Sequence, residues 1–110
     1  MRNRLDEQLE LLNTELIRMG ALCEDGIAQA AKVLVTRDEA LRRAVEKADD
    51  EVDALFNKVK SEIIALIAEK PEEGETCLDL LMVAKYFERI GDHAVNIAEW
   101  VVFSLTGEHD

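Results

Sequence analysis

The sequence predicts an all-α fold in which residues 1–110 form one domain, an up-down-up antiparallel three-helix bundle. Hydrophobic residues recur at alternating steps of three and four along three segments, which is the spacing of helices packed in a bundle. Each segment runs about 30 residues, and the breaks between segments are short enough to make neighbouring helices antiparallel. Alternating runs of β-branched residues are absent, which excludes most all-β folds.

The hydrophobic positions of the three predicted helices lie within residues 5–34, 41–66 and 83–105. At the first break we expect Thr36 to cap the second helix, with Glu39 completing a capping box. Pro71 interrupts the chain at the second break, because proline ends a helix. Gly107 is expected to end the third helix.

The charge of the chain limits its partners. It carries 24 Asp and Glu against 13 Lys and Arg, a formal net charge of −11. This sign opposes binding to nucleic-acid phosphates or to anionic lipid, so we expect no nucleic-acid partner and at most a peripheral contact with membranes. The N-terminus is charged where a signal peptide would be apolar, and no apolar run approaches the roughly 20 residues of a transmembrane helix. We therefore expect a soluble cytoplasmic protein.

Two pairs of acidic residues have an informative spacing. Asp49 and Asp53 are four residues apart on the second predicted helix. Glu88 and Asp92 repeat this spacing on the third helix, and Asn96 follows four residues later. Both pairs lie about 20 residues from the second break, so antiparallel packing brings them to the same height. Like charges at this spacing repel, and a cation bound by several carboxylate oxygens would offset the repulsion.

Spacing alone leaves two interpretations of these pairs open. Acidic residues on long helices are usually solvated, and a chain with 24 of them contains several such pairs by chance. The pairs therefore indicate either a solvated acidic face or a metal site. The Glu-x-x-His pairs of di-iron bundles are absent, as are a nucleophile–base pair and a phosphate-binding loop, so we expect no enzymatic activity.

Three other features have structural as well as functional interpretations. The apolar run from Trp100 to Phe103 is wider than one helical stripe, which predicts either a partner-binding surface for self-association or a cap on the bundle end. Gly91 inside the third helix predicts a close helix approach or a gap facing a metal. Cys23 and Cys77 are expected to lie about 24 Å apart, too far for a disulfide.

A long motif in the third helix carries a resemblance to a known family. Residues 87–100 read F-E-R-I-G-D-H-A-V-N-I-A-E-W, which resembles the E-R-I-G-D-H-A-x-N-I-A-E block of the PhoU family of phosphate-transport regulators. Residues 49–53, D-D-E-V-D, are similar to the second acidic motif of that family, and residues 1–20 resemble its usual start. The resemblance covers essentially the whole chain.

This resemblance implies a three-helix repeat whose acidic motifs bind divalent or trivalent metal ions, in multinuclear clusters of iron or zinc. Carried onto this chain, the implied ligands are Asp49, Asp53, Glu88 and Asp92, with Asn96 as a further candidate. The resemblance also implies a non-enzymatic negative regulator. Such a protein links the phosphate ABC transporter to the sensor histidine kinase of phosphate starvation through protein contacts at the cytoplasmic face of the membrane.

The chain departs from the family pattern in its length. Family members usually contain two tandem three-helix repeats, whereas this chain has one. A single repeat would rebuild the two-repeat body by pairing with a second copy, so we expect a homodimer. The alternative hypothesis is a structural helical dimerisation or adaptor module with a solvated acidic face and no metal.

Overall fold

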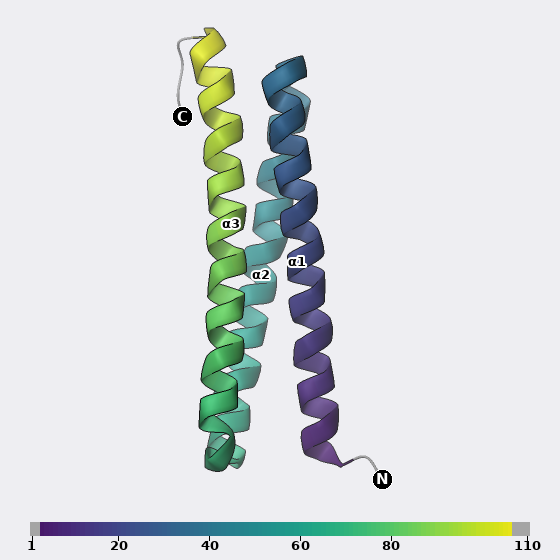
Figure 1. The fold of residues 1–110 in the computed structure, drawn as a ribbon, viewed down its shortest axis with the longest axis vertical. Coiled ribbons are helices and arrows are strands. Elements are labelled where there is room, and N and C mark those ends of the chain that lie inside the picture. Colours follow the sequence, from purple (N-terminus) through teal and green to yellow (C-terminus); the bar gives the residue numbers. More distant parts are fainter. Residues whose placement is uncertain (1–2, 107–110) are drawn as a thin grey trace.

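The computed structural model describes residues 3–106, which form three long helices lying side by side (Figure 1). Helix α1 spans Arg4–Thr36, α2 spans Glu39–Glu69 and α3 spans Gly74–Thr106, and a short 3₁₀ helix, η1, spans Pro71–Glu73. Each of the three helices packs against the other two, which confirms the predicted up-down-up bundle. The body is elongated, with extents of 56 × 23 × 16 Å. None of the helices in this range has the apolar stretch that a bilayer-spanning segment needs.

The cap of α2 differs from the prediction. Asp38, not Thr36, caps this helix, because the Asp38 carboxylate accepts a hydrogen bond from the Ala40 backbone N–H at 2.8 Å. Thr36 is the last residue of α1, and its hydroxyl donates to the Lys32 carbonyl at 2.8 Å. The prediction was wrong because Arg37 adopts a left-handed conformation, with φ 58°, that ends α1 immediately after Thr36.

The second break is formed as predicted. Pro71 begins η1, a position where its missing N–H and fixed φ are tolerated. The chain then re-enters an α-helix at Gly74. Gly107, predicted to end the third helix, lies outside the described residues.

The hydrophobic core consists of two clusters stacked along the bundle. The larger cluster includes Met19, Val52 and Ala84, and the smaller cluster, nearer the first break, includes Val45 and Ala94. Neither cluster contains a buried residue from 46–51 of α2 or from 88–93 of α3. These two segments contain Asp49, Glu88 and Asp92 of the predicted acidic pairs, and Asp53 directly follows Val52 of the larger cluster, so the acidic residues lie at or next to the place where the buried hydrophobic packing is interrupted.

The two cysteines are both buried in the larger cluster. Cys23 and Cys77 are free thiols, as predicted. The Cys23 thiol donates a hydrogen bond to the Phe87 carbonyl at 3.1 Å, which links α1 to α3 just below the interruption of the core. Counting residues back from the first break predicts that Cys23 lies near the height of the acidic pairs, and the effect of the Asp49 charge on its thiol agrees with this position.

A pair of carboxyl groups connects α1 to α2 closer to the N-terminus of α1. Glu15 is only 5% exposed, and its Oε2 lies 3.1 Å from the Lys58 ammonium. Glu62 hydrogen-bonds with Glu15, and burial, this bond and the charge of Glu15 raise the pKa of Glu62 to about 7. Glu62 therefore keeps its proton at a pH where most glutamates have lost theirs.

The raised pKa of Glu62 should make folding stability depend on pH. Between its ordinary pKa of 4.5 and its folded pKa of about 7, Glu62 retains its proton in the folded chain and loses it in the unfolded chain. The free energy of unfolding should therefore fall as the pH rises through this window. Glu62→Gln should reduce that fall, measured by urea unfolding from about pH 4 to about pH 9.

Glu69→Gln is the matched control for this measurement. Glu69 pairs with Arg4 at 2.9 Å, and this contact lowers its pKa. The control should leave the loss of stability above pH 4.5 in place. A Glu62→Gln profile that superimposes on the wild-type profile would contradict the raised pKa of Glu62.

Candidate metal centre

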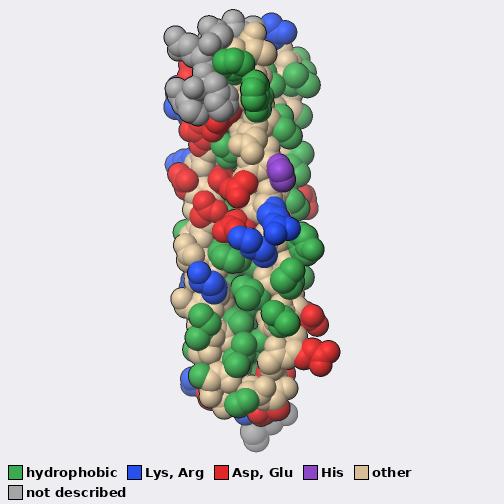
Figure 2. All heavy atoms as spheres, turned by 90° about the vertical axis from the view of Figure 1, so that its left-hand side faces the viewer, with side chains coloured by type: hydrophobic (Ala, Val, Ile, Leu, Met, Phe, Trp, Pro, Cys, Tyr) green, Lys and Arg blue, Asp and Glu red, His purple; other side chains and the backbone are tan. Residues whose placement is uncertain are grey.

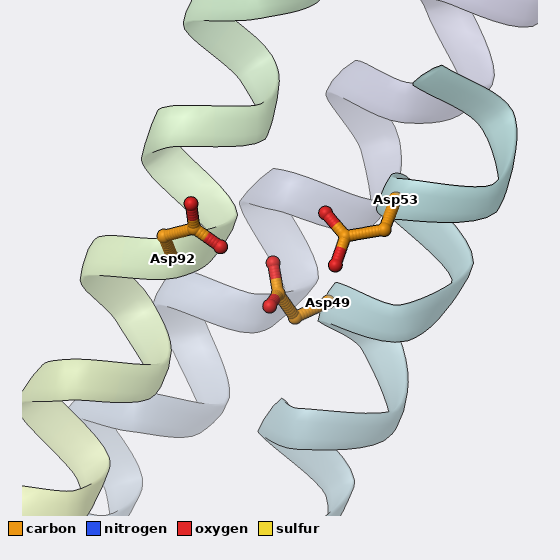
Figure 3. A group of neighbouring side chains, drawn as sticks. All are labelled: Asp49, Asp53 and Asp92. Atoms are coloured by element: carbon orange, nitrogen blue, oxygen red, sulfur yellow. The ribbon is translucent and has the colours of Figure 1, made fainter. Parts of the chain in front are cut away.

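Three carboxylates meet between α2 and α3, where the hydrophobic packing is interrupted. Asp49 and Asp53 project from α2 and Asp92 projects from α3, and all three turn toward one another (Figure 3). One oxygen from each lies within 4.8 Å of the others. The spacing of four residues places the first two on one side of α2, and antiparallel packing brings Asp92 to their height. We refer to these three residues as the aspartate triad.

The other two predicted ligands are not part of the aspartate triad. Glu88 lies at its edge, where its Oε1 contacts the Lys85 ammonium at 2.6 Å. Its charge still reaches the triad, because it contributes to the raised pKa of Asp53. Asn96 is exposed and lines a surface groove on α3 together with His93.

Gly91 provides the recess that accommodates the Asp49 carboxylate. A methyl group at Gly91 would collide with Asp49 Oδ1. This oxygen is buried and has no hydrogen-bond partner. Because a buried carboxylate oxygen without a partner costs free energy, the recess favours either a proton or a cation at this point. The donor set therefore fits a hard cation bound by carboxylate oxygens.

The electrostatics of the aspartate triad agree with this geometry. Burial raises the pKa of Asp49 to about 7, and the charges of Asp53 and Asp92 add to the effect. Burial also raises the pKa of Asp53, followed by the charges of Asp92 and Glu88, while Lys85 acts in the opposite direction. Figure 2 shows acidic side chains gathered on this side of the molecule, next to a group of Lys and Arg side chains.

Sequence reasoning missed Lys85, a neighbour of the aspartate triad. Lys85 pairs with Glu88 and lies 5.3 Å from the centre of the Phe56 ring. The sequence could have predicted this ion pair, because Lys85 precedes Glu88 by three residues on the same helix. Cys23 lies behind the triad, where burial and the charge of Asp49 raise its pKa. Its thiol therefore stays protonated near neutral pH and is a poor metal ligand in this state.

The predicted partner-binding residues lie at the far end of α3. Trp100 is 58% exposed, and its ring meets that of Phe103 edge to face, with centroids 5.0 Å apart. Trp100 also lines the groove that contains Asn96. Trp100 is therefore exposed, whereas Val101 and Val102 of the same apolar run pack against the smaller core cluster.

The chain is similar to proteins of one family. The PhoU domain family matches residues 16–101. A "Phosphate-specific transport system accessory protein PhoU homolog" of Caulobacter vibrioides is 36% identical over 102 residues, which cover 93% of this chain and 44% of the relative. The protein of the same name from Clostridium acetobutylicum is 34% identical over 115 residues, covering 99% and 52%. The chain thus spans about half the length of these curated relatives. No solved structure matches it.

Replacing Gly91 by alanine should expel the Asp49 carboxylate from its recess. Because burial is the largest cause of the raised pKa, the pKa of Asp49 should fall from about 7 toward its ordinary value of 3.8 in Gly91→Ala. A carboxyl-carbon NMR titration in the presence of a chelator measures this change. In the control Gly74→Ala, where an added Cβ meets nothing within 4 Å, the pKa should stay near 7. The same Asp49 pKa in both variants would contradict the role of Gly91.

Proposed function

The chain belongs to the PhoU family, and from this membership we propose that it is a regulatory accessory component of phosphate transport and has no enzymatic activity. The names of its curated relatives, accessory proteins of phosphate-specific transport systems, support this role. In the proposed role the protein works in the cytoplasm as a homodimer, through protein contacts. Its partners are the phosphate ABC transporter and the sensor histidine kinase of phosphate starvation, and it represses the starvation response.

We propose that the aspartate triad binds a divalent or trivalent metal ion, such as iron or zinc. The observation that carries this proposal is the buried, unpartnered Asp49 Oδ1 inside a group of three converging carboxylates. Glu88 would join a larger cluster of ions by leaving Lys85, and Asn96 would join it from the next turn of α3. A bound ion would supply positive charge that replaces carboxylate repulsion with attraction and ties α2 to α3.

The competing proposal is a helical dimerisation or adaptor module with a solvated acidic face. Two observations favour it: Asp92 is exposed, and Lys85 already supplies a positive charge beside Glu88. The two proposals differ in how the folded chain responds to metal ions.

Metal binding should raise the melting temperature of the wild-type chain. A ligand that binds only the folded state at about 100 times its Kd adds about 2.7 kcal/mol to stability. Asp49→Asn combined with Asp92→Asn should abolish the shift, because two of the three carboxylates are lost. We would measure thermal unfolding by circular dichroism after chelator treatment, with Fe²⁺, Zn²⁺ or Mn²⁺ added separately.

Asp50→Asn is the control for this experiment, because Asp50 is an exposed neighbour outside the aspartate triad. It should retain most of the shift. A wild-type melting temperature that none of the metals changes would favour the solvated acidic face.

The regulatory role predicts a defect in phosphate sensing. Deleting the gene in the organism that carries it should raise the expression of phosphate-starvation genes in phosphate-rich medium, measured by a transcriptional reporter. The wild-type gene should restore repression, and the Asp49→Asn, Asp92→Asn variant should restore it less completely if the metal is needed. Unchanged reporter expression in the deletion strain would contradict the regulatory role, whatever the outcome of the metal measurement.

A further inference from the structure

One face of the bundle, formed by α1 and α3, exposes large hydrophobic side chains along most of its length. We call it the α1–α3 face. Its large side chains are each 36% to 73% exposed, and they are Ile17, Ile27, Leu34, Val83, Tyr86, Ile90, Ile97 and Trp100. In Figure 2, hydrophobic side chains recur along the right-hand edge of the view, with some charged side chains between them.

A groove between the two helices shows that Ile17 of α1 and Val83 of α3 share one side of the molecule. It is lined by Ile17 and Gly20 from α1 and by Val83 and Phe87 from α3. Gly20 lets the two helices approach closely, because a Cβ at this position would lie 3.2 Å from the Phe87 ring. The groove therefore joins α1 and α3 into a single surface.

Heptad spacing extends this surface toward the C-terminal ends of both helices. Ile27 and Leu34 follow Gly20 by seven and fourteen residues, so they lie on the same side of α1. Ile90 and Ile97 follow Val83 by the same steps on α3. Ile97 also lines the second groove, the one that contains Trp100. The two grooves are thus parts of one face.

The two grooves of the α1–α3 face carry little charge in a chain where 34% of residues are charged, and outside them the Arg89 guanidinium lies 5.6 Å from the centre of the Tyr86 ring. Among the described residues that line the two grooves, Glu24 is the one acidic residue, and none is Lys or Arg. Depletion of charge around large apolar and aromatic side chains is typical of the buried core of a protein interface. Single exposed hydrophobic residues are ordinary, but a continuous face of them indicates an interaction site.

We infer that the α1–α3 face binds the same face of a second copy of this chain. Each copy carries a net charge of −11, so two copies associate best through a surface with few carboxylates. A basic partner would instead be drawn to the acidic side of α2 and α3. The inference rests on the proposed homodimer and is independent of the metal.

The exposed area of the face is sufficient for a stable dimer. Large side chains present roughly 150–250 Å² each, so eight that are about half exposed offer on the order of 800 Å². That is about the area that each partner contributes to a standard protein–protein interface. A symmetric pair would use this area twice, once on each copy.

The test is the mass of the chain in solution, measured by sedimentation equilibrium. The wild type should have twice the monomer mass of 12.4 kDa. A double variant, Ile17→Glu with Ile97→Glu, should be a monomer, because it would bury four carboxylates in the symmetric interface. The matched control is Ile64→Glu with Ile67→Glu, which changes two exposed isoleucines of α2 that line neither groove. This control should remain a dimer.

Fluorescence provides a second readout that needs no variant. Trp100 is the one tryptophan of the chain and lies on the proposed interface. Diluting the wild type through the dissociation range should shift its emission to longer wavelength as water reaches the indole, while circular dichroism stays unchanged. This measurement tests the face even if the glutamate variants fail to fold.

Two outcomes would overturn the inference. A wild type that is monomeric, with emission independent of concentration, would exclude a second copy as the occupant. A dimer that dissociates with the α2 control variant and persists with Ile17→Glu, Ile97→Glu would place the interface elsewhere. Neither outcome affects metal binding, because the melting shift with metal is read at the aspartate triad and serves as a separate check on the proposed function.

Discussion

The structure depends on an interruption of its hydrophobic core. Two clusters of buried side chains stabilise the two parts of the bundle, and between them Gly91 leaves room for a carboxylate instead of a hydrophobic side chain. Asp49 fills this space with an oxygen that has no partner, and Asp53 and Asp92 add like charge at the same height. Without a compensating positive charge, burying these carboxylates lowers the free energy of unfolding. A proton or a bound ion can supply that charge, and two residues of this site, Gly91 and Asp92, lie within the sequence motif of residues 87–100.

Protons provide part of the compensation at two separate places. Asp49 and Glu62 both have a pKa raised to about 7, and in both cases burial is the main cause and a neighbouring carboxyl group adds to it. The surroundings differ in one respect. The pair of Glu15 and Glu62 has Lys58 as a nearby cation, whereas Asp49 Oδ1 faces the backbone of Gly91. This difference is why we propose a metal at the aspartate triad and only a proton at Glu62.

The sequence was sufficient to predict the bundle and the height of the acidic pairs, because hydrophobic periodicity and helix rise determine both. The sequence was insufficient to predict which of several nearby groups a single side chain contacts. Glu88 turns to Lys85 rather than to the aspartate triad, since an ammonium three residues away offers a closer opposite charge. Asn96 lies along a groove on α3. Asp38 caps α2 instead of Thr36, because Arg37 adopts a left-handed conformation that ends α1 after Thr36. Sequence spacing does not predict this conformation.

An odd number of long helices has a consequence for whatever is attached to this chain. The described chain begins at one pole of the bundle and finishes at the opposite pole (Figure 1), along an axis of 56 Å. Polypeptides fused to the two ends of the described chain would be separated by the length of the bundle. A fluorescent donor and acceptor attached at these ends would report whether the bundle is folded. An antiparallel bundle with an even number of helices would instead bring both fused polypeptides to the same end.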